Sequence, residues 1–194
     1  MPLGKSLVTK WGKYYDGMSE EPKAERMRTA LTIFRIASED GQPVAVPGFK
    51  DTLFMGSIGT AYSTDALCQA GITHVVCATD ASRISPQFTT LRVSVADRED
   101  ARGEMNAVLG MVRAFIDHAR AHGGRVLVHC FQGVSRATTL VCAYMLLSGT
   151  FSSLDASLAA VRSVRPQACP NAGFVAMLRT LESACIAVTS RSNT

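Results

Sequence analysis

Long apolar segments are missing from this sequence: no hydrophobic run approaches the roughly 18 residues that a membrane-spanning helix needs. The first residues, MPLGKSLVTKWGKYY, contain neither an apolar signal core nor a glycine at position 2. We therefore expect no membrane association, no secretion and no myristoylation. The expected location is the cytoplasm, with the nucleus as the alternative.

A large excess of charge is missing as well. The chain holds 20 Lys and Arg against 16 Asp and Glu, a formal net charge of +4, and its basic residues are scattered. Nucleic-acid-binding domains gather basic residues on one face or segment. We expect no nucleic-acid partner, while an anionic substrate remains compatible with this charge.

The six cysteines lack the spacing of metal ligands. They form no Cys-x-x-Cys pair and no cluster with histidine, and most lie in apolar segments. The pattern predicts free thiols in a reducing compartment and no metal site.

What the chain does contain is an alternation of strand and helix patterns. Its 194 residues are 47% hydrophobic, enough for one domain with a sizeable core. Strand patterns lie at 51–57, 72–78, 88–97 and 125–129. Helix patterns lie at 63–71, 103–124, 136–147, 154–164 and 172–188, and the buried stripe expected in the second of these is Val108, Met111, Val112, Phe115 and Ile116. This order predicts a single α/β domain with a largely parallel central sheet flanked by helices.

The polar residues 1–42 precede this alternation. Met27, Leu31 and Phe34 fall at helical spacing, so we expect an N-terminal extension with one amphipathic helix. Residues 43–194 are the expected folded domain.

The stretch RVLVHCFQGVSRATT, residues 125–139, carries the main chemical signal. A strand runs into a short loop that opens a helix, an arrangement whose backbone amides favour an anion and whose cysteine favours the thiolate form. Gly133 permits a tight turn, and Arg136 offers a planar fork to two oxygens of a tetrahedral dianion. The stretch predicts that Cys130 is a nucleophile below an anion-binding loop. The alternatives are a small apolar residue at a strand end and, for Arg136, a solvated charge.

HCFQGVSRAT resembles the H-C-x2-G-x-S-R signature of the dual-specificity protein phosphatases, a family of cysteine-dependent phosphatases. The resemblance extends over residues 43–185 through PGFKDTLFMGSIGTA, LCQAGITHVVCAT and VRSVRPQACPNAGFVAMLRTLE. It implies a catalytic domain at 43–194 whose catalytic loop lies between a core strand and a helix N-terminus. The implied activity is hydrolysis of protein phosphotyrosine and phosphothreonine or phosphoserine through a cysteinyl phosphate, with phosphoproteins as partners and no cofactor.

The same resemblance assigns roles around Cys130. We expect His129 to support the thiolate by hydrogen bonding, and the loop to bind phosphate or sulfate. The expected substrate-binding residues are Phe131, Gln132, Gly133, Val134, Ser135 and Arg136. Asn171 matches a family asparagine near the loop, and its alternative role is the N-cap of the last helix.

Cleavage also needs a proton for the leaving oxygen. Asp97, Glu99 and Asp100 follow the strand expected at 88–97, and Asp97 matches the family's acid. We expect Asp97 to be the general acid, with Asp100 and Asp80 as alternatives. In the non-catalytic interpretation, Asp97 is a loop carboxylate or a helix N-cap.

One position departs from the family pattern. Ala137 occupies the position where the family usually has a serine or threonine, whose hydroxyl helps the cysteine sulfur to leave. Thr138 is about 100° further round the helix and is not expected to replace it. This departure favours one rival function, a phosphoprotein-binding module with weak turnover. A second rival, independent of Ala137, is a phosphatase acting on a non-protein phosphate monoester. Cys77, at the end of a neighbouring strand, is a candidate redox partner of Cys130.

Overall fold

The computed structural model describes residues 28, 31–32, 35, 40–80 and 84–192 of the chain. The helix expected around Met27, Leu31 and Phe34 lies largely outside these residues, so it stays a prediction, as does the separation of residues 1–42 from 43–194.

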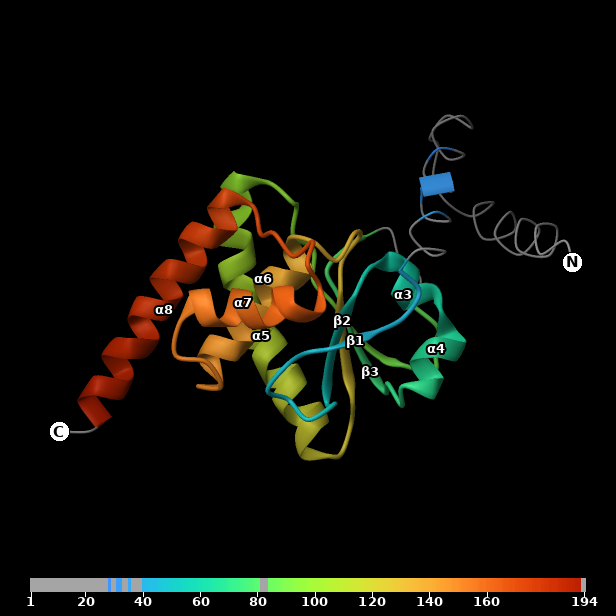
Figure 1. The fold of residues 1–194 in the computed structure, drawn as a ribbon, viewed down its shortest axis with the longest axis horizontal. Coiled ribbons are helices and arrows are strands. Elements are labelled where there is room, and N and C mark those ends of the chain that lie inside the picture. Colours follow the sequence, from blue (N-terminus) through green and yellow to red (C-terminus); the bar gives the residue numbers. More distant parts are fainter. Residues whose placement is uncertain (1–27, 29–30, 33–34, 36–39, 81–83, 193–194) are drawn as a thin grey trace, which may run out of the picture.

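A five-stranded sheet forms the centre of the molecule (Figure 1). Its strands are β1 (Val44–Ala45), β2 (Leu53–Gly56), β3 (His74–Cys77), β4 (Thr89–Arg92) and β5 (Val126–His129). They are ordered β1-β2-β5-β3-β4, and only the β1–β2 pairing is antiparallel among the described strands. The predicted α/β domain with a largely parallel sheet is confirmed.

Helices cover the two faces of this sheet unequally (Figure 1). The short helices α3 (Ile58–Tyr62) and α4 (Thr64–Gln69) lie on one side. On the other side lie α5 (Arg102–Ala121), α6 (Arg136–Leu147), α7 (Leu154–Val164) and α8 (Ala172–Ser192), with a 3-10 turn η1 (Glu99–Ala101) before α5. The larger apolar core fills the space between β5 and the second group of helices, and a smaller one lies under α3 and α4.

The position of β5 follows from its composition. Val126, Leu127 and Val128 are fully buried, as expected of a branched apolar strand with parallel neighbours on both sides. α6 begins seven residues after β5 ends and is itself buried along most of its length. The loop between them, residues 130–135, is therefore held by the two most buried elements of the fold.

The predicted 88–97 strand is shorter in the structure. Only Thr89–Arg92 pair with β3, although Val93 and Val95 continue the alternation and are 2% and 3% exposed. β4 is an edge strand whose one partner ends at Cys77, so the chain beyond it has no neighbour with which to continue the ladder. The chain therefore leaves the sheet before it reaches Asp97.

The expected stripe of α5 was partly wrong. Met111 is 49% exposed, and the buried face consists of Met105, Leu109, Val112, Ile116 and Ala119. The stripe of α5 that packs on the sheet is rotated away from Met111. The apolar pattern of the helix alone does not determine which stripe faces the sheet. Ser63 precedes α4, and its hydroxyl donates to the Gly59 carbonyl instead of capping α4.

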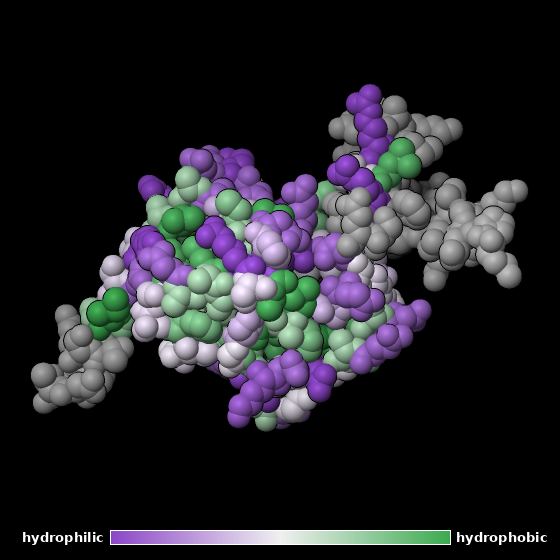
Figure 2. Space-filling view, in the orientation of Figure 1, coloured by the Kyte–Doolittle hydropathy of each residue, from purple (hydrophilic) through white to green (hydrophobic). Residues whose placement is uncertain are grey.

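The surface mixes polar and apolar residues on the face shown in Figure 2, with an apolar area near the C-terminal end of α8, where Ile186 and Val188 are 54% and 66% exposed. No helix in the described part of the chain has both the length and the apolar character needed to cross a membrane.

Candidate active site

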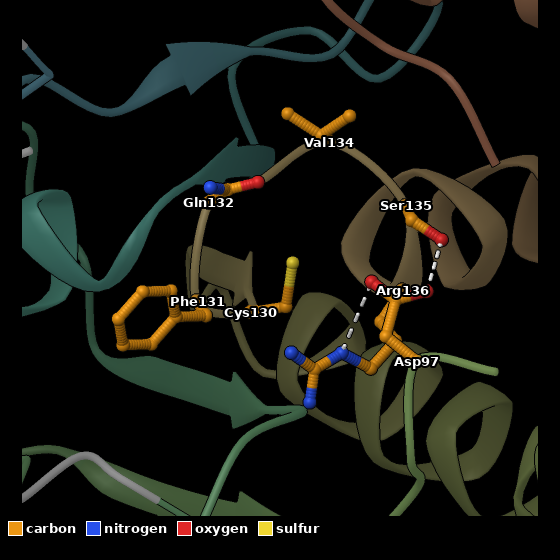
Figure 3. A pocket seen from close by; sticks show the side chains of 7 residues that line it. All are labelled: Asp97, Cys130, Phe131, Gln132, Val134, Ser135 and Arg136. Atoms are coloured by element: carbon orange, nitrogen blue, oxygen red, sulfur yellow. Dashed lines mark hydrogen bonds and ion pairs between the residues drawn. The ribbon is translucent and has the colours of Figure 1, made fainter. Parts of the chain in front are cut away.

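A cavity of about 150 Å³ opens where β5 ends (Figure 3). It lies at the C-terminal edge of the parallel strands, the edge at which open α/β sheets bind their ligands. The residues that line it are Asp97, Cys130, Phe131, Gln132, Val134, Ser135 and Arg136. The sequence predicted all seven as site residues, and the structure brings them together around one space.

Cys130 lies at the floor of the loop and is only 2% exposed. The backbone N–H of Gly133 donates to its Sγ over 3.2 Å. Gly133 has φ +67°, and a Cβ there would lie 2.5 Å from the Gly56 carbonyl oxygen at the end of β2. The tight turn that aims this amide at the sulfur therefore requires glycine.

Arg136 begins α6 and extends along the other wall of the cavity. Its Nη1 donates to the Val95 carbonyl over 3.3 Å, and its Nε lies 3.7 Å from Asp97 Oδ2. Figure 3 shows this ion pair beside the Cys130 sulfur. A guanidinium that lines the same cavity as the thiol and has a carboxylate partner is well suited to exchange that partner for an oxyanion.

Asp97 reaches the cavity from the segment between β4 and η1. Ser135 Oγ donates to its Oδ1 over 2.7 Å, and Asn171 Nδ2 donates to the same oxygen over 2.9 Å. The carboxylate thus has a fixed orientation between the loop and the start of α8.

The side chain of Asn171 makes two contacts at once. Its Oδ1 accepts from the Phe174 N–H over 3.0 Å, which is the N-cap contact of α8. Its Nδ2 holds Asp97 at the same time. One side chain therefore links the end of a helix to the carboxylate in the cavity.

The alternative acids lie outside the lining of the cavity. Asp100 pairs with Arg98 over 2.7 Å on the surface, and Asp80 accepts from Ser94 Oγ over 3.4 Å. Neither is held toward Cys130 by a described contact.

His129 is fully buried, and its Nδ1 donates to the Cys130 carbonyl over 3.2 Å. Its Nε2 has no hydrogen-bond partner among the described residues. Burial lowers the pKa of His129 to about 4, although the bond to the Cys130 backbone opposes this shift. The imidazole is neutral near pH 7 and acts on the loop through its backbone.

The six cysteines all lie in the described part of the chain, and none of them forms a disulfide there. Burial raises the pKa of Cys142, inside α6, to about 12, so that thiol is not a nucleophile at neutral pH. Within the described ranges, no three His, Cys, Asp or Glu side chains gather closely enough to hold a metal ion.

An arginine that contacts the loop, and the carboxylate that pairs with it, carried no signal in the sequence. Arg165, at the C-terminal end of α7, donates to the carbonyls of Gln132 and Gly133, and Asp40 pairs with Arg165. Arg165 is separated from the loop by α6 and α7, so no local pattern links them.

A free thiol below a loop of amides, an arginine at the start of the next helix and a carboxylate across the cavity define the site of a cysteine-dependent phosphatase. The family described as "Dual specificity phosphatase, catalytic domain" matches residues 53–184. The chain belongs to this family and is a dual-specificity protein phosphatase, a phosphoric monoester hydrolase that acts on phosphorylated substrates.

Named relatives agree with this assignment. Dual specificity protein phosphatase 1 of Arabidopsis thaliana is 36% identical over 78% of this chain and 75% of its own length. Dual specificity protein phosphatase 1B of the same plant is 33% identical over 80% of this chain and 96% of its own. The solved structure of DUSP15 superposes with a TM-score of 0.64 and 29% identity, covering 76% of this chain and 96% of its own.

Proposed function

We propose that Cys130, Arg136 and Asp97 carry out this hydrolysis in two steps. In the first, the Cys130 thiolate attacks phosphorus, the bond to the leaving oxygen breaks, and Asp97 gives that oxygen its proton. In the second, Asp97 takes a proton from water, the water oxygen attacks phosphorus, and the Cys130 thiolate is released with inorganic phosphate. The observation that carries the proposal is the single cavity on which all three side chains converge.

Arg136 and the loop amides are proposed to bind the non-bridging oxygens of the phosphoryl group. Such donors are most effective when they are fixed before the charge develops. The Gly133 N–H already points at the sulfur, and Arg136 is anchored on the Val95 carbonyl. We expect phosphate or sulfate to bind at this place.

The substrates proposed are phosphotyrosine and phosphothreonine or phosphoserine residues of proteins. The variable loop residues Phe131, Gln132, Val134 and Ser135 carry no charge, whereas a polyphosphorylated ring would favour lysines there. The cytoplasm, with the nucleus as the alternative, stays part of the proposal.

The roles of Cys130 and Asp97 are tested by varying the leaving group. Cys130→Ser should abolish turnover and keep the unfolding temperature. Asp97→Asn should slow a phosphothreonine peptide by roughly 10²–10⁴-fold and an activated aryl phosphate far less, because an aryl oxide leaves without a proton. Asp100→Asn, which removes a nearby surface carboxylate, is the matched control and should change neither rate. Equal losses on both substrates would reject Asp97 as the acid.

A binding module with weak turnover is the second candidate, and Ala137 is the observation that favours it. This function would be established by two results together: a phosphopeptide still binds, and the protein does not accelerate its hydrolysis over the rate in buffer.

A further inference from the structure

Arg165 lies behind the loop of residues 130–135, on the side away from the cavity, with its side chain 1% exposed. Its Nε donates to the Gly133 carbonyl over 2.7 Å, and its Nη2 donates to the Gln132 carbonyl over 2.8 Å. Asp40 completes the contacts: Nη1 lies 3.0 Å from its Oδ1 and Nη2 lies 2.5 Å from its Oδ2. Every nitrogen of this buried guanidinium is engaged.

The two carbonyls that Arg165 holds determine where two amides point. In a trans peptide unit, the C=O and the following N–H point in opposite directions. The Gln132 carbonyl shares its peptide unit with the Gly133 N–H, and this N–H points at Cys130 Sγ over 3.2 Å. The Gly133 carbonyl shares its unit with the Val134 N–H, which is thereby turned away from Arg165. Holding the carbonyls from behind turns both amides toward the side of the cavity.

Hydrogen bonds to the backbone of Asp40 fix this residue beside Arg165. Its backbone carbonyl accepts from Thr60 Oγ1 over 2.8 Å and from Ser57 Oγ over 3.3 Å. Ser57 follows β2 and caps α3. A buried guanidinium without a counter-charge is costly, so the carboxylate of Asp40 offsets the burial of Arg165 and holds its side chain in place.

Asp40 lies upstream of residue 53, where the match to the family begins, and within the segment expected to be an extension. We propose that Asp40 and Arg165 are positioning residues of the phosphatase reaction: Arg165 orients the loop amides toward the phosphoryl group, and Asp40 holds Arg165. This inference rests on the proposed function of the loop as the phosphate-binding element. It makes part of the N-terminal segment necessary for full activity.

Three variants of the full chain test the proposal. Asp40→Asn removes the counter-charge and keeps the shape of the side chain. Arg165→Lys keeps a positive charge near Asp40, but a single ammonium cannot reproduce the planar fork that reaches two carbonyls. Asp155→Asn is the matched control. Asp155 also forms an ion pair over 2.5 Å, but its partner is Arg179 and the pair lies on the surface.

The measurements are the inhibition constant of inorganic phosphate, kcat/KM for an aryl phosphate and the unfolding temperature. At a temperature where each variant is folded, Asp40→Asn and Arg165→Lys should weaken phosphate binding by about tenfold, the effect of one lost hydrogen bond to a charged group. Asp40→Glu should recover part of this loss. Asp155→Asn should bind phosphate as the wild type does.

Unchanged phosphate inhibition in folded Arg165→Lys overturns the proposal, even if its unfolding temperature falls, because the pair would then be structural only. Arg165→Lys also decides the matter if Asp40→Asn does not fold. A wild-type protein that fails to bind phosphate, or a Cys130→Ser variant that keeps its turnover, would instead refute the proposed function of the loop.

Discussion

Ala137 is the residue at which the chain departs from its family, and the structure shows its surroundings. It is fully buried in the first turn of α6, directly after Arg136. The hydroxyl of the next residue, Thr138, is buried and has no hydrogen-bond partner in the described part of the chain. The Gly133 N–H is the donor that does contact the sulfur. If Cys130 is the proposed nucleophile, the donor in place to support the departing thiolate is this backbone N–H.

This arrangement predicts slow breakdown of the cysteinyl phosphate. A hydrogen bond to a charged group contributes about 1.5–3 kcal/mol, so the missing hydroxyl slows the second step by roughly ten- to a hundredfold. Rapid-mixing measurements with an aryl phosphate should show a burst of one equivalent of product. Ala137→Ser should raise kcat and shrink the burst without changing its rate constant.

Ala143→Ser is the matched control for this prediction, because Ala143 is equally buried in α6 but lies away from the loop. It should leave the burst unchanged. A wild-type protein without a burst, together with an Ala137→Ser variant of unchanged kcat, would show that the backbone donor already suffices.

At the scale of elements, the contact between η1 and the first turn of α8 determines where Asp97 lies. A Cβ at Gly173 would come within 1.9 Å of the Glu99 carbonyl oxygen. Asn171, two residues earlier, holds Asp97 directly. The segment that carries the proposed acid thus packs against the first turn of α8, where position 173 has no room for a side chain.

Gly173→Ala should therefore displace the start of α8 and, with it, Asn171 and the acid. A displacement of 1 Å can cost about a hundredfold in rate, so kcat/KM for a phosphothreonine peptide should fall by roughly this factor. An activated aryl phosphate should be affected much less. Gly103→Ala, which places its Cβ in open space on α5, is the control and should change neither value. An equal loss on both substrates would indicate a general distortion of the site.

The parallel pairing of β3 and β5 bears on the proposed redox pair. Cys77 lies opposite His129, which is the residue before Cys130. The Cys77 thiol donates to the Thr79 carbonyl over 3.1 Å. Because successive residues of a strand point to opposite faces, Cys130 does not share the face of Cys77, and a disulfide between them requires a local rearrangement. Peroxide would first oxidise the Cys130 thiolate to a sulfenic acid, and the Cys77 thiol would then attack its sulfur and release water.

Mass spectrometry after mild peroxide should detect the Cys77–Cys130 peptide pair, and Cys77→Ser should increase sulfinic acid at Cys130. Cys68→Ser, which removes an exposed thiol, is the control. Overoxidation of Cys130 in the wild type without any crosslink would show that Cys77 is only a packed residue.

Elements with a strong local period could be predicted from the sequence almost completely. The patterns at 136–147 and 154–164 coincide with α6 and α7, because apolar spacing and the glycine between them are local signals. The same holds for the loop, whose residues are consecutive. The true length of β4 could not be predicted, because it depends on where its partner strand ends. Arg165 and Asp40 are 125 residues apart, and a contact over that distance leaves no pattern in either segment.

At the scale of the whole molecule, His129 couples stability to pH. Its folded-state pKa of about 4 lies below the ordinary value of 6.5, so the unfolded chain binds the proton more readily between these two values. The neutral imidazole thus costs no stability above pH 6.5, and stability falls as the pH drops from 6.5 toward 4.

Between pH 7 and pH 5, this group should lower the free energy of unfolding by about 2 kcal/mol. Urea titrations at both pH values measure the change. His129→Asn, whose amide can still donate to the Cys130 carbonyl, should show a loss smaller by about this amount. The same loss in both proteins would place the acid sensitivity in other groups.

The order of the strands has a consequence for the time course of synthesis. β5 is the last strand along the chain and the middle strand of the sheet. While the ribosome is making residues 78–125, β2 and β3 have been synthesised but lack β5, the strand that joins them, and their unpaired edges are open to wrong partners. Parallel pairing over such separations is slow. Arg165 emerges later still, so a nascent chain that already carries Cys130 and Arg136 still lacks the residue proposed to orient the loop amides.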